Sequence, residues 1–191
     1  FLPILVLIAL FALSANAQLD QNFGTNGTIS LNVQTPVQGK NKPLASFLLS
    51  DGKIFVVNEG RTSGEQPIYG YSFVRFNANG TLDTSYGANG IVRIQLPALP
   101  VANPRMISAA RQTDGKILLA GGASVLRYNE NGTIDTTFSG DGVHSPNVEP
   151  QMEETANAVI QQPDGKILVA GNFNQMGGAG KNASPGAPAL I

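Results

Sequence analysis

The sequence repeats itself, and this repeat limits the possible folds more than any other feature. The string DGKI occurs at Asp51, Asp114 and Asp164, and the two later copies continue as DGKILLAG and DGKILVAG. A second block follows the first two copies, YSFVRFNANGTLDTSYGANG from Tyr71 and ASVLRYNENGTIDTTFSGDG from Ala123. The successive DGK aspartates are 63 and 50 residues apart, a spacing typical of propeller blades and other stacked units. We therefore expect an array of similar structural units.

Each unit has the pattern of four short strands. The segment 106–112 leads through Asp-Gly, a strong hairpin signal because both residues accept positive φ, into the apolar run KILLAG at 116–121. Such a run is typical of a central strand covered on both faces. SVLRYN at 124–129 then ends at an Asn-Gly turn, and VHSPNV at 143–148 follows as an outer strand. Four antiparallel strands per unit predict an all-β, β-propeller-like array, with a β-solenoid as the alternative.

The units are incomplete at both ends of the sequence. QLDQNFGTNGTISL from Gln18 aligns with TLDTSYGANGIVRI from Thr81, and PALI at 188–191 stands where a third strand is expected. A closed propeller needs at least four blades, so we expect this fragment of about two and a half blades to be open, with its first tail available to close a ring. The predicted parts are a signal peptide at 1–17, the tail of a repeat at 18–42, repeat 1 at 43–96, repeat 2 at 97–148 and a truncated repeat 3 at 149–191.

The first 17 residues have the pattern of an export signal. FLPILVLIALFALSANA is an apolar run that ends in Ala15-Asn16-Ala17, a small-x-small pattern that a signal peptidase accepts. The run is short for a bilayer span. It has no initial Met and no basic residue, so we expect a signal clipped at its N-terminus. The mature protein is then expected to begin at Gln18 and to be secreted or on the cell surface, without a membrane segment.

Two blocks of sequence resemble a known family. QTDGKILLAG at 112–121, followed by VLRYNENGTIDTTFSGDG at 125–142, is similar to the delta-60 repeat, and QQPDGKILVAG at 161–171 matches its opening block. The resemblance extends over nearly all of residues 18–191. It implies an exported bacterial protein with a β-propeller-like fold, and it implies no catalytic residues. Repeat 1 departs from the pattern, because it reads SDGKIFVVNEG and carries an insertion from Glu59 to Gly70.

Composition argues against several classes of function. The chain has 12 Lys and Arg against 13 Asp and Glu, a formal net charge of −1, and these residues are scattered along the sequence. We therefore expect no nucleic-acid partner. There is no Cys, which excludes disulfides, thiolate metal ligands and a thiol nucleophile.

The repeated aspartates are expected to be structural. Those of the DGK motif lie in turns, and those before a Thr or another polar residue can brace an Asx turn by accepting backbone N–H bonds. His144 is the only histidine, so it has no second His or Cys for a zinc site or a catalytic pair. No DxDxDG calcium loop is present. We expect no catalytic residue, no cofactor and no metal. The aspartates are Asp51, Asp114 and Asp164 in the first group and Asp20, Asp83 and Asp135 in the second.

Variation between the units is concentrated after the second strand. The separation from DGK to the NGT block is 28 residues in one unit and 17 in the next, whereas the separation from NGT to the following DGK is 35 and then 33. Scaffolds commonly keep their strands and vary the loops that bind, so this loop is the predicted binding region. The candidate partner-binding residues are Arg61, Glu65, Tyr69, Asn172, Phe173, Asn174 and Gln175.

Three functions of different classes fit this sequence. The leading hypothesis is a non-catalytic extracellular β-propeller scaffold whose variable loops bind a protein or carbohydrate partner. The second is a structural or adhesive cell-surface protein in which the repeat is a spacer. The third is a propeller enzyme such as a lyase, hydrolase or quinoprotein, against which the single His and the absence of Trp argue.

Overall fold

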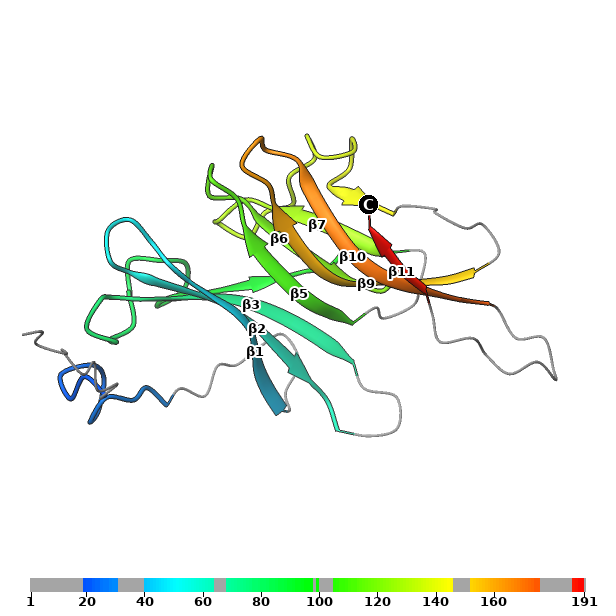
Figure 1. Cartoon of the computed structure of the whole chain (residues 1–191). Coiled ribbons are helices and arrows are strands. Elements are labelled where there is room, and N and C mark those ends of the chain that lie inside the picture. The colour runs from blue at the N-terminus through cyan, green and yellow to red at the C-terminus, as the bar shows by residue number, and fades with distance from the viewer. Residues whose placement is uncertain are drawn as a thin grey trace, which may run out of the picture.

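The first repeated unit folds into a four-stranded antiparallel sheet, as seen in a computed structural model of the chain (Figure 1). The structure describes residues 19–30, 40–63, 68–97, 99, 105–145, 152–175 and 187–190. The strands pair in sequence order, so each strand is hydrogen-bonded to its neighbours in the sequence. They are β1 (Lys40–Leu48), β2 (Ile54–Arg61), β3 (Tyr69–Phe76) and β4 (Ile91–Ile94).

The second unit repeats this sheet. Its strands are β5 (Met106–Arg111), β6 (Ile117–Gly121), β7 (Ser124–Tyr128) and β8 (Val143–His144), again paired in sequence order. Every residue of β6 is buried, which confirms that its apolar run forms a central strand covered on both faces. The outer strand β8 is shorter than the segment VHSPNV suggested, and residues 146–150 lie outside the described part.

The third unit forms a three-stranded sheet in the order β11-β10-β9. It contains β9 (Met152–Gln161), β10 (Ile167–Gln175) and β11 (Ala187–Leu190). β11 pairs with β10 in the place expected for a third strand. Pro188 is therefore on a strand at the edge of this sheet, a position where a missing N–H is tolerated.

The sheets stack face to face in sequence order. β1 contacts β5, and β5 contacts β9, so the first strands of successive units lie side by side. Alternate residues of sheet 1, such as Phe55 and Phe73, pack against Leu126 and Tyr128 of sheet 2 in one buried cluster. A second cluster, which includes Leu118 of sheet 2 and Val169 of sheet 3, joins the next pair. The described residues thus form an all-β array with no helix and no closed ring, as the repeat predicts.

The DGK hairpins, predicted from the Asp-Gly motif, have a three-residue loop. Gln112 N donates to Lys116 O at 2.8 Å and Gly115 N donates to Gln112 O at 3.0 Å, which is a three-residue loop with a glycine in the left-handed region. The φ of Gly115 is +90°, whereas Asp114 is not among the residues of positive φ. The predicted hairpin is confirmed, and of the two residues that accept positive φ only the glycine adopts it.

The segment 19–30 repeats the tail of the two later units. Phe23 N donates to Asp20 O at 3.0 Å, as Tyr86 N does to Asp83 O. This segment packs on repeat 1, because Gly24 N donates to Asn79 O at 2.9 Å. A Cβ built on Gly80 would lie 2.9 Å from Ile29, and a Cβ built on Gly132 would lie 2.3 Å from Val92. In the described part, the segment 19–30 and the tail of unit 1 therefore each contact the Asn-Gly turn of the following unit.

Some predictions concern residues outside the described part. The predicted signal peptide at 1–17 lies there, as do residues 31–39 of the predicted ring-closing tail. β1 begins at Lys40, shortly before the predicted start of repeat 1 at residue 43. Within the described residues, no helix is long and apolar enough to cross a membrane.

Candidate functional site

The array has two ends with different chemistry (Figure 1). We call the end that carries the DGK hairpins at 49–53, 112–116 and 162–166 the DGK end. The opposite end, where β2, β6 and β10 finish, is called the loop end. At the loop end β6 passes to β7 through only two residues, whereas β2 passes to β3 through residues 62–68.

Aspartates at the DGK end brace their own hairpins. Oδ1 of Asp51 accepts a hydrogen bond from Lys53 N at 3.1 Å, and Asp114 accepts the same bond from Lys116 N at 3.1 Å. Asp164 repeats the arrangement in the third unit. These are Asx turns, in which a short polar side chain replaces a backbone acceptor. The turn role expected for the repeated aspartates is therefore visible in all three units.

The second repeated aspartate of unit 1 joins three parts of its sheet. Oδ2 of Asp83 accepts from Lys53 Nζ at 2.9 Å and from Arg75 Nε at 2.7 Å, while Oδ1 accepts from the backbone and hydroxyl of Ser85. The hydrogen bond from the Ser85 hydroxyl and the ammonium of Lys53 lower the pKa of Asp83 well below its usual value. Asp83 therefore links the DGK hairpin to β3 and to the following turn.

The same arrangement recurs in unit 2. Asp135 accepts from Arg127 Nε at 2.7 Å and pairs with Lys116 Nζ at 3.3 Å, and it accepts from Thr137 N and Oγ1 at 3.1 and 2.7 Å. The Thr137 hydroxyl makes the largest contribution to lowering the pKa of Asp135. We call these groups the Lys–Arg–Asp triads. Sequence reasoning identified the turn role of these aspartates but missed the ion pairs.

A further ion pair connects the two units at the DGK end. Glu130 of unit 2 accepts from Arg75 Nη1 of unit 1 at 3.3 Å and from Arg111 Nη2 at 3.2 Å. The guanidinium of Arg75 also lies over the ring of Tyr86, with Cζ 4.4 Å from its centroid. The Tyr86 hydroxyl in turn donates to the carbonyl of Glu130. The charges of this end are thus used within the fold.

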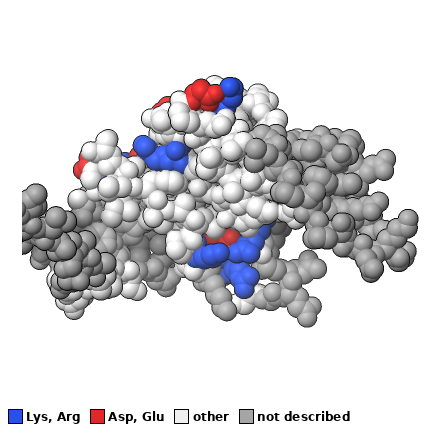
Figure 2. All heavy atoms as spheres, viewed as in Figure 1, with Lys and Arg blue, Asp and Glu red and all other residues white. Residues whose placement is uncertain are grey.

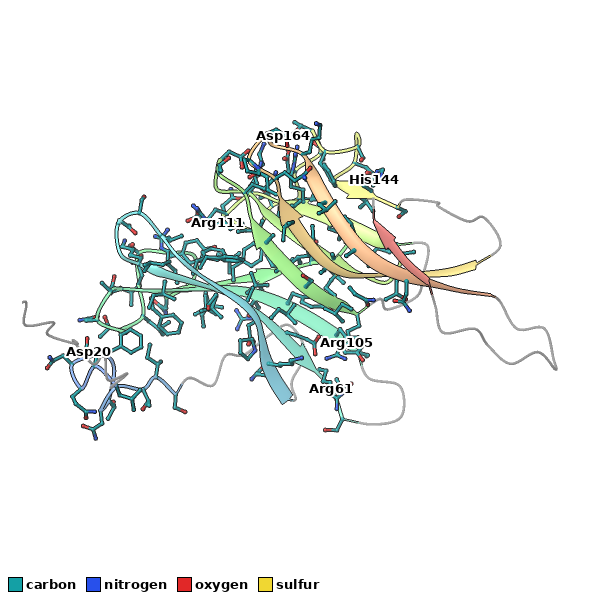
Figure 3. The ribbon with its side chains drawn as sticks, viewed as in Figure 1. Asp20, Arg61, Arg105, Arg111, His144 and Asp164 are labelled. Carbon is teal, nitrogen blue, oxygen red and sulfur yellow. The ribbon has the colours of Figure 1, made fainter. Side chains whose placement is uncertain are left out.

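Arg61 and Arg105 both lie at the loop end (Figure 3), where Arg105 pairs with a buried acid. Arg105, which precedes β5, donates from Nε and Nη2 to the two carboxylate oxygens of Glu59 at 3.0 and 3.1 Å. The Glu59 side chain is 2% exposed and that of Arg105 is 38% exposed. This hydrogen bonding raises the pKa of Arg105. The Cζ of Arg105 also lies 5.6 Å from the ring centroid of Tyr69.

Tyr71 of unit 1 also contacts unit 2 at this end. Its hydroxyl oxygen accepts a hydrogen bond from the backbone N–H of Met106 at 2.7 Å, and burial raises its pKa well above the usual range. Glu59 and Arg105 were not predicted from the sequence. The available signal was the acidic residue in SDGKIFVVNEG, at the position where the DGKILLAG unit has Gly122.

The predicted binding residues fall into two separate groups. Arg61 and Tyr69 lie opposite each other across the β2–β3 hairpin, whereas Glu65 lies outside the described residues. Asn172 is on the third sheet, where its Oδ1 accepts from Asn157 Nδ2 at 2.5 Å. The structure brings the first pair together with Arg105 but does not bring Asn172 to them. Phe173, Asn174 and Gln175 continue β10, and the surroundings of their side chains lie outside the description.

His144 and the acidic residues do not gather into a metal site in the described part of the chain. His144 is exposed, with Nδ1 3.3 Å from the Ser139 hydroxyl and its ring against Phe138. Within the described ranges, no group of three or more His, Cys, Asp or Glu could hold a metal ion.

Antiparallel sheets that stack in sequence order with their first strands side by side define a β-propeller repeat protein. The sequence comparisons agree with this class. Residues 49–86, 112–138 and 162–183 match the family model described as "Domain of unknown function (DUF5122) beta-propeller". The matched segments contain the DGK hairpins of the three units. The family match therefore supports a β-propeller repeat family.

Other comparisons add little about activity. No curated protein matches the chain. A solved structure, described as that of a protein of unknown function from Bacteroides caccae, matches with 12% sequence identity and a TM-score of 0.45. The match covers 79% of this chain and 47% of that one, so this chain spans less than half the length of the solved protein.

Proposed function

We propose that the chain is a non-catalytic extracellular scaffold of the delta-60 repeat type, which binds a protein or carbohydrate partner at its loop end. The apolar run and Ala15-Asn16-Ala17 pattern support export. The motif blocks support the delta-60 assignment, because the hairpins and triads occupy the positions where the repeat is most regular.

The observation that carries the proposal is the contrast between the two ends of the array. At the DGK end, Lys53 and Lys116 use their charge in ion pairs that recur in the first two units. At the loop end, the units differ in length and in residues, from the two-residue connection after Gly121 to the longer one after Arg61. A scaffold that conserves its packing and varies its contacts places binding where the variation is.

The state of the repeated carboxylates supports a non-catalytic role for them. A general acid needs a pKa near the working pH, whereas the pKa values of Asp83 and Asp135 are lowered by hydroxyl and cation hydrogen bonds. Both side chains are also 6% exposed. Such groups brace turns and sheets more readily than they transfer protons to a substrate.

The test is a pull-down with the full-length protein on a glycan array and on extracts of cell-surface proteins. In the test variant, residues 62–68 are replaced by the two-residue Gly-Ala connection found after β6. A matched control lengthens the third DGK hairpin by one glycine after Gly165, where the space around the turn is open. We expect the loop variant to lose capture and the control to retain it. Equal capture by both would place binding away from the β2–β3 connection.

A further inference from the structure

Lys and Arg residues are scattered along the sequence, but in the fold those with an ion pair and those without one lie in different places. The described side chains of Lys and Arg at the DGK end, together with Arg105, all form ion pairs. Of the Lys and Arg residues whose side chains the structure describes, three form no ion pair, and all three belong to sheet 1. They are Lys42 on β1, Arg61 on β2 and Arg93 on β4.

Strand register places two of these cations on the same face. Lys42 lies opposite Glu59, and Arg61 lies opposite Tyr69. Directly opposite residues share a face of a sheet, and so do residues two positions apart in one strand. Lys42, Glu59, Arg61 and Tyr69 are therefore on one face at the loop end. Arg93 lies opposite Ser72 and is on the other face.

Arg105 of unit 2 reaches this face and changes its charge balance. It neutralises the buried Glu59 through two hydrogen bonds and lies over Tyr69. The two hydrogen bonds use Nε and Nη2, so Nη1 is not used in the described contacts. The local charge is then two positive units in a chain whose net charge is −1. Figure 2 shows these cations as a group of blue atoms at the lower centre, in the place where Figure 3 labels Arg61 and Arg105.

We propose that Lys42, Arg61, Tyr69 and Arg105, here called the Arg61 patch, bind a polysaccharide that carries uronate carboxylates. This inference rests on the proposed function and specifies its ligand. A guanidinium is the side chain best suited to a planar carboxylate, which it can bind through two parallel hydrogen bonds. The Tyr69 ring offers an apolar surface beside these cations for the C–H face of a sugar ring.

The composition of the patch favours a glycan over an acidic protein. Protein interfaces obtain most of their affinity from apolar or aromatic anchors in fully desolvated pockets. The Arg61 patch has a single aromatic ring among cations, and Lys42 is exposed while Arg61 is half-buried. A polymer with a charge on every sugar gains affinity from several such exposed contacts at once.

The test measures binding of the full-length protein to polygalacturonate and alginate. Fully methyl-esterified pectin serves as the neutral probe and poly-glutamate as the acidic polypeptide. We expect binding to at least one polyuronate, weakening as salt screens the charges, and weak binding to the neutral polymer. The variant K42A/R61A should lose roughly 2- to 30-fold in affinity, as expected for two ion pairs at the surface. The control R93A/K166A removes the same charge elsewhere and should bind as the wild type does.

Other outcomes would overturn the proposal. These are no binding to either polyuronate, equal affinity of K42A/R61A and the control, or stronger binding to poly-glutamate, which would indicate an acidic protein partner. Matching thermal unfolding of the variants would show that the substitutions leave the fold intact. If the loop-shortened variant loses capture in the pull-down while K42A/R61A does not, the proposed function stands and the Arg61 patch does not supply the ligand contact.

Discussion

Removing the acidic member of a Lys–Arg–Asp triad should destabilise the protein. Asp135 is 6% exposed and is held by Arg127, Lys116 and Thr137. Breaking a buried ion pair from one side costs roughly 3–5 kcal/mol, because the partner charge is left buried. The side chains of Arg127 and Lys116 are 16% and 29% exposed, so water can reach them. We therefore expect Asp135→Ala to lower the free energy of unfolding by about 2–3 kcal/mol.

The measurement is urea unfolding of the full-length protein followed by far-ultraviolet circular dichroism. Asp135→Asn keeps an oxygen for the Thr137 N–H but removes the charge, so its cost should lie between that of Asp135→Ala and zero. Asp164→Ala is the matched control, since the Asp164 and Lys166 side chains are 53% and 76% exposed, and it should leave the free energy of unfolding nearly unchanged. Equal effects of Asp135→Ala and Asp164→Ala would refute the structural role of the triad.

The triad also predicts how the difference depends on pH. The folded-state pKa of Asp135 is lowered relative to an unfolded value near 3.9. Its contribution is therefore complete above the unfolded pKa and is lost as the pH falls through the folded pKa. The stability difference between the wild type and Asp135→Ala should be constant near neutral pH and should shrink below about pH 4. A difference that persists undiminished in acid would contradict the argument.

Two further predictions concern the contact between units and the buried tyrosines. Gly132→Ala should lower the free energy of unfolding more than Gly165→Ala, since both glycines have φ near +86° but only the first would place a Cβ 2.3 Å from Val92. Overpacking adds roughly 1–3 kcal/mol to the cost of the backbone strain. Equal losses of stability in urea unfolding would contradict this prediction. Burial raises the pKa of Tyr71 and Tyr128, so stability should fall above pH 10 by up to about 1.4 kcal/mol per pH unit for each tyrosine. Because Tyr69 is only half-buried, the readout uses a Tyr69→Phe background, in which tyrosinate absorbance at 295 nm that rises before unfolding would argue against this burial.

Much of the fold could be predicted because its signals are local. The Asp-Gly and Asn-Gly turns, the apolar run around Leu118 and the repeated spacing each depend on residues close in sequence. Stacking of the units followed from the repeat, since one sheet cannot cover its own apolar face. The turn type was not predicted, because Asp114 contributes its side-chain acceptor and only the glycine has a positive φ.

The chemistry of the two ends could not be predicted in the same way. The triad joins Lys53 to Asp83 across 30 positions, and only the strand register brings them together. Glu59 and Arg105 are 46 positions apart and belong to different units, so their pairing depends on how the sheets stack. Arg61 and Tyr69 were found through loop variation, which indicates the end of the array but not the neighbour that completes the patch.

The arrangement of both the DGK end and the loop end depends on how successive units stack, with the tail of one unit against the Asn-Gly turn of the next. The sequence has no cysteine, so the double variant Val92→Cys/Gly132→Cys tests this stacking directly. A Cβ at residue 132 lies 3.6 Å from the Cβ of Val92, within the range of a disulfide, and replacing Val92 removes the methyl group that would overlap it. Mild oxidation of the folded protein should form an intramolecular disulfide, measured by mass spectrometry and thiol titration. Two free thiols in the folded double variant, no more reactive toward each other than those of Val92→Cys/Gly165→Cys, would contradict the stacked arrangement.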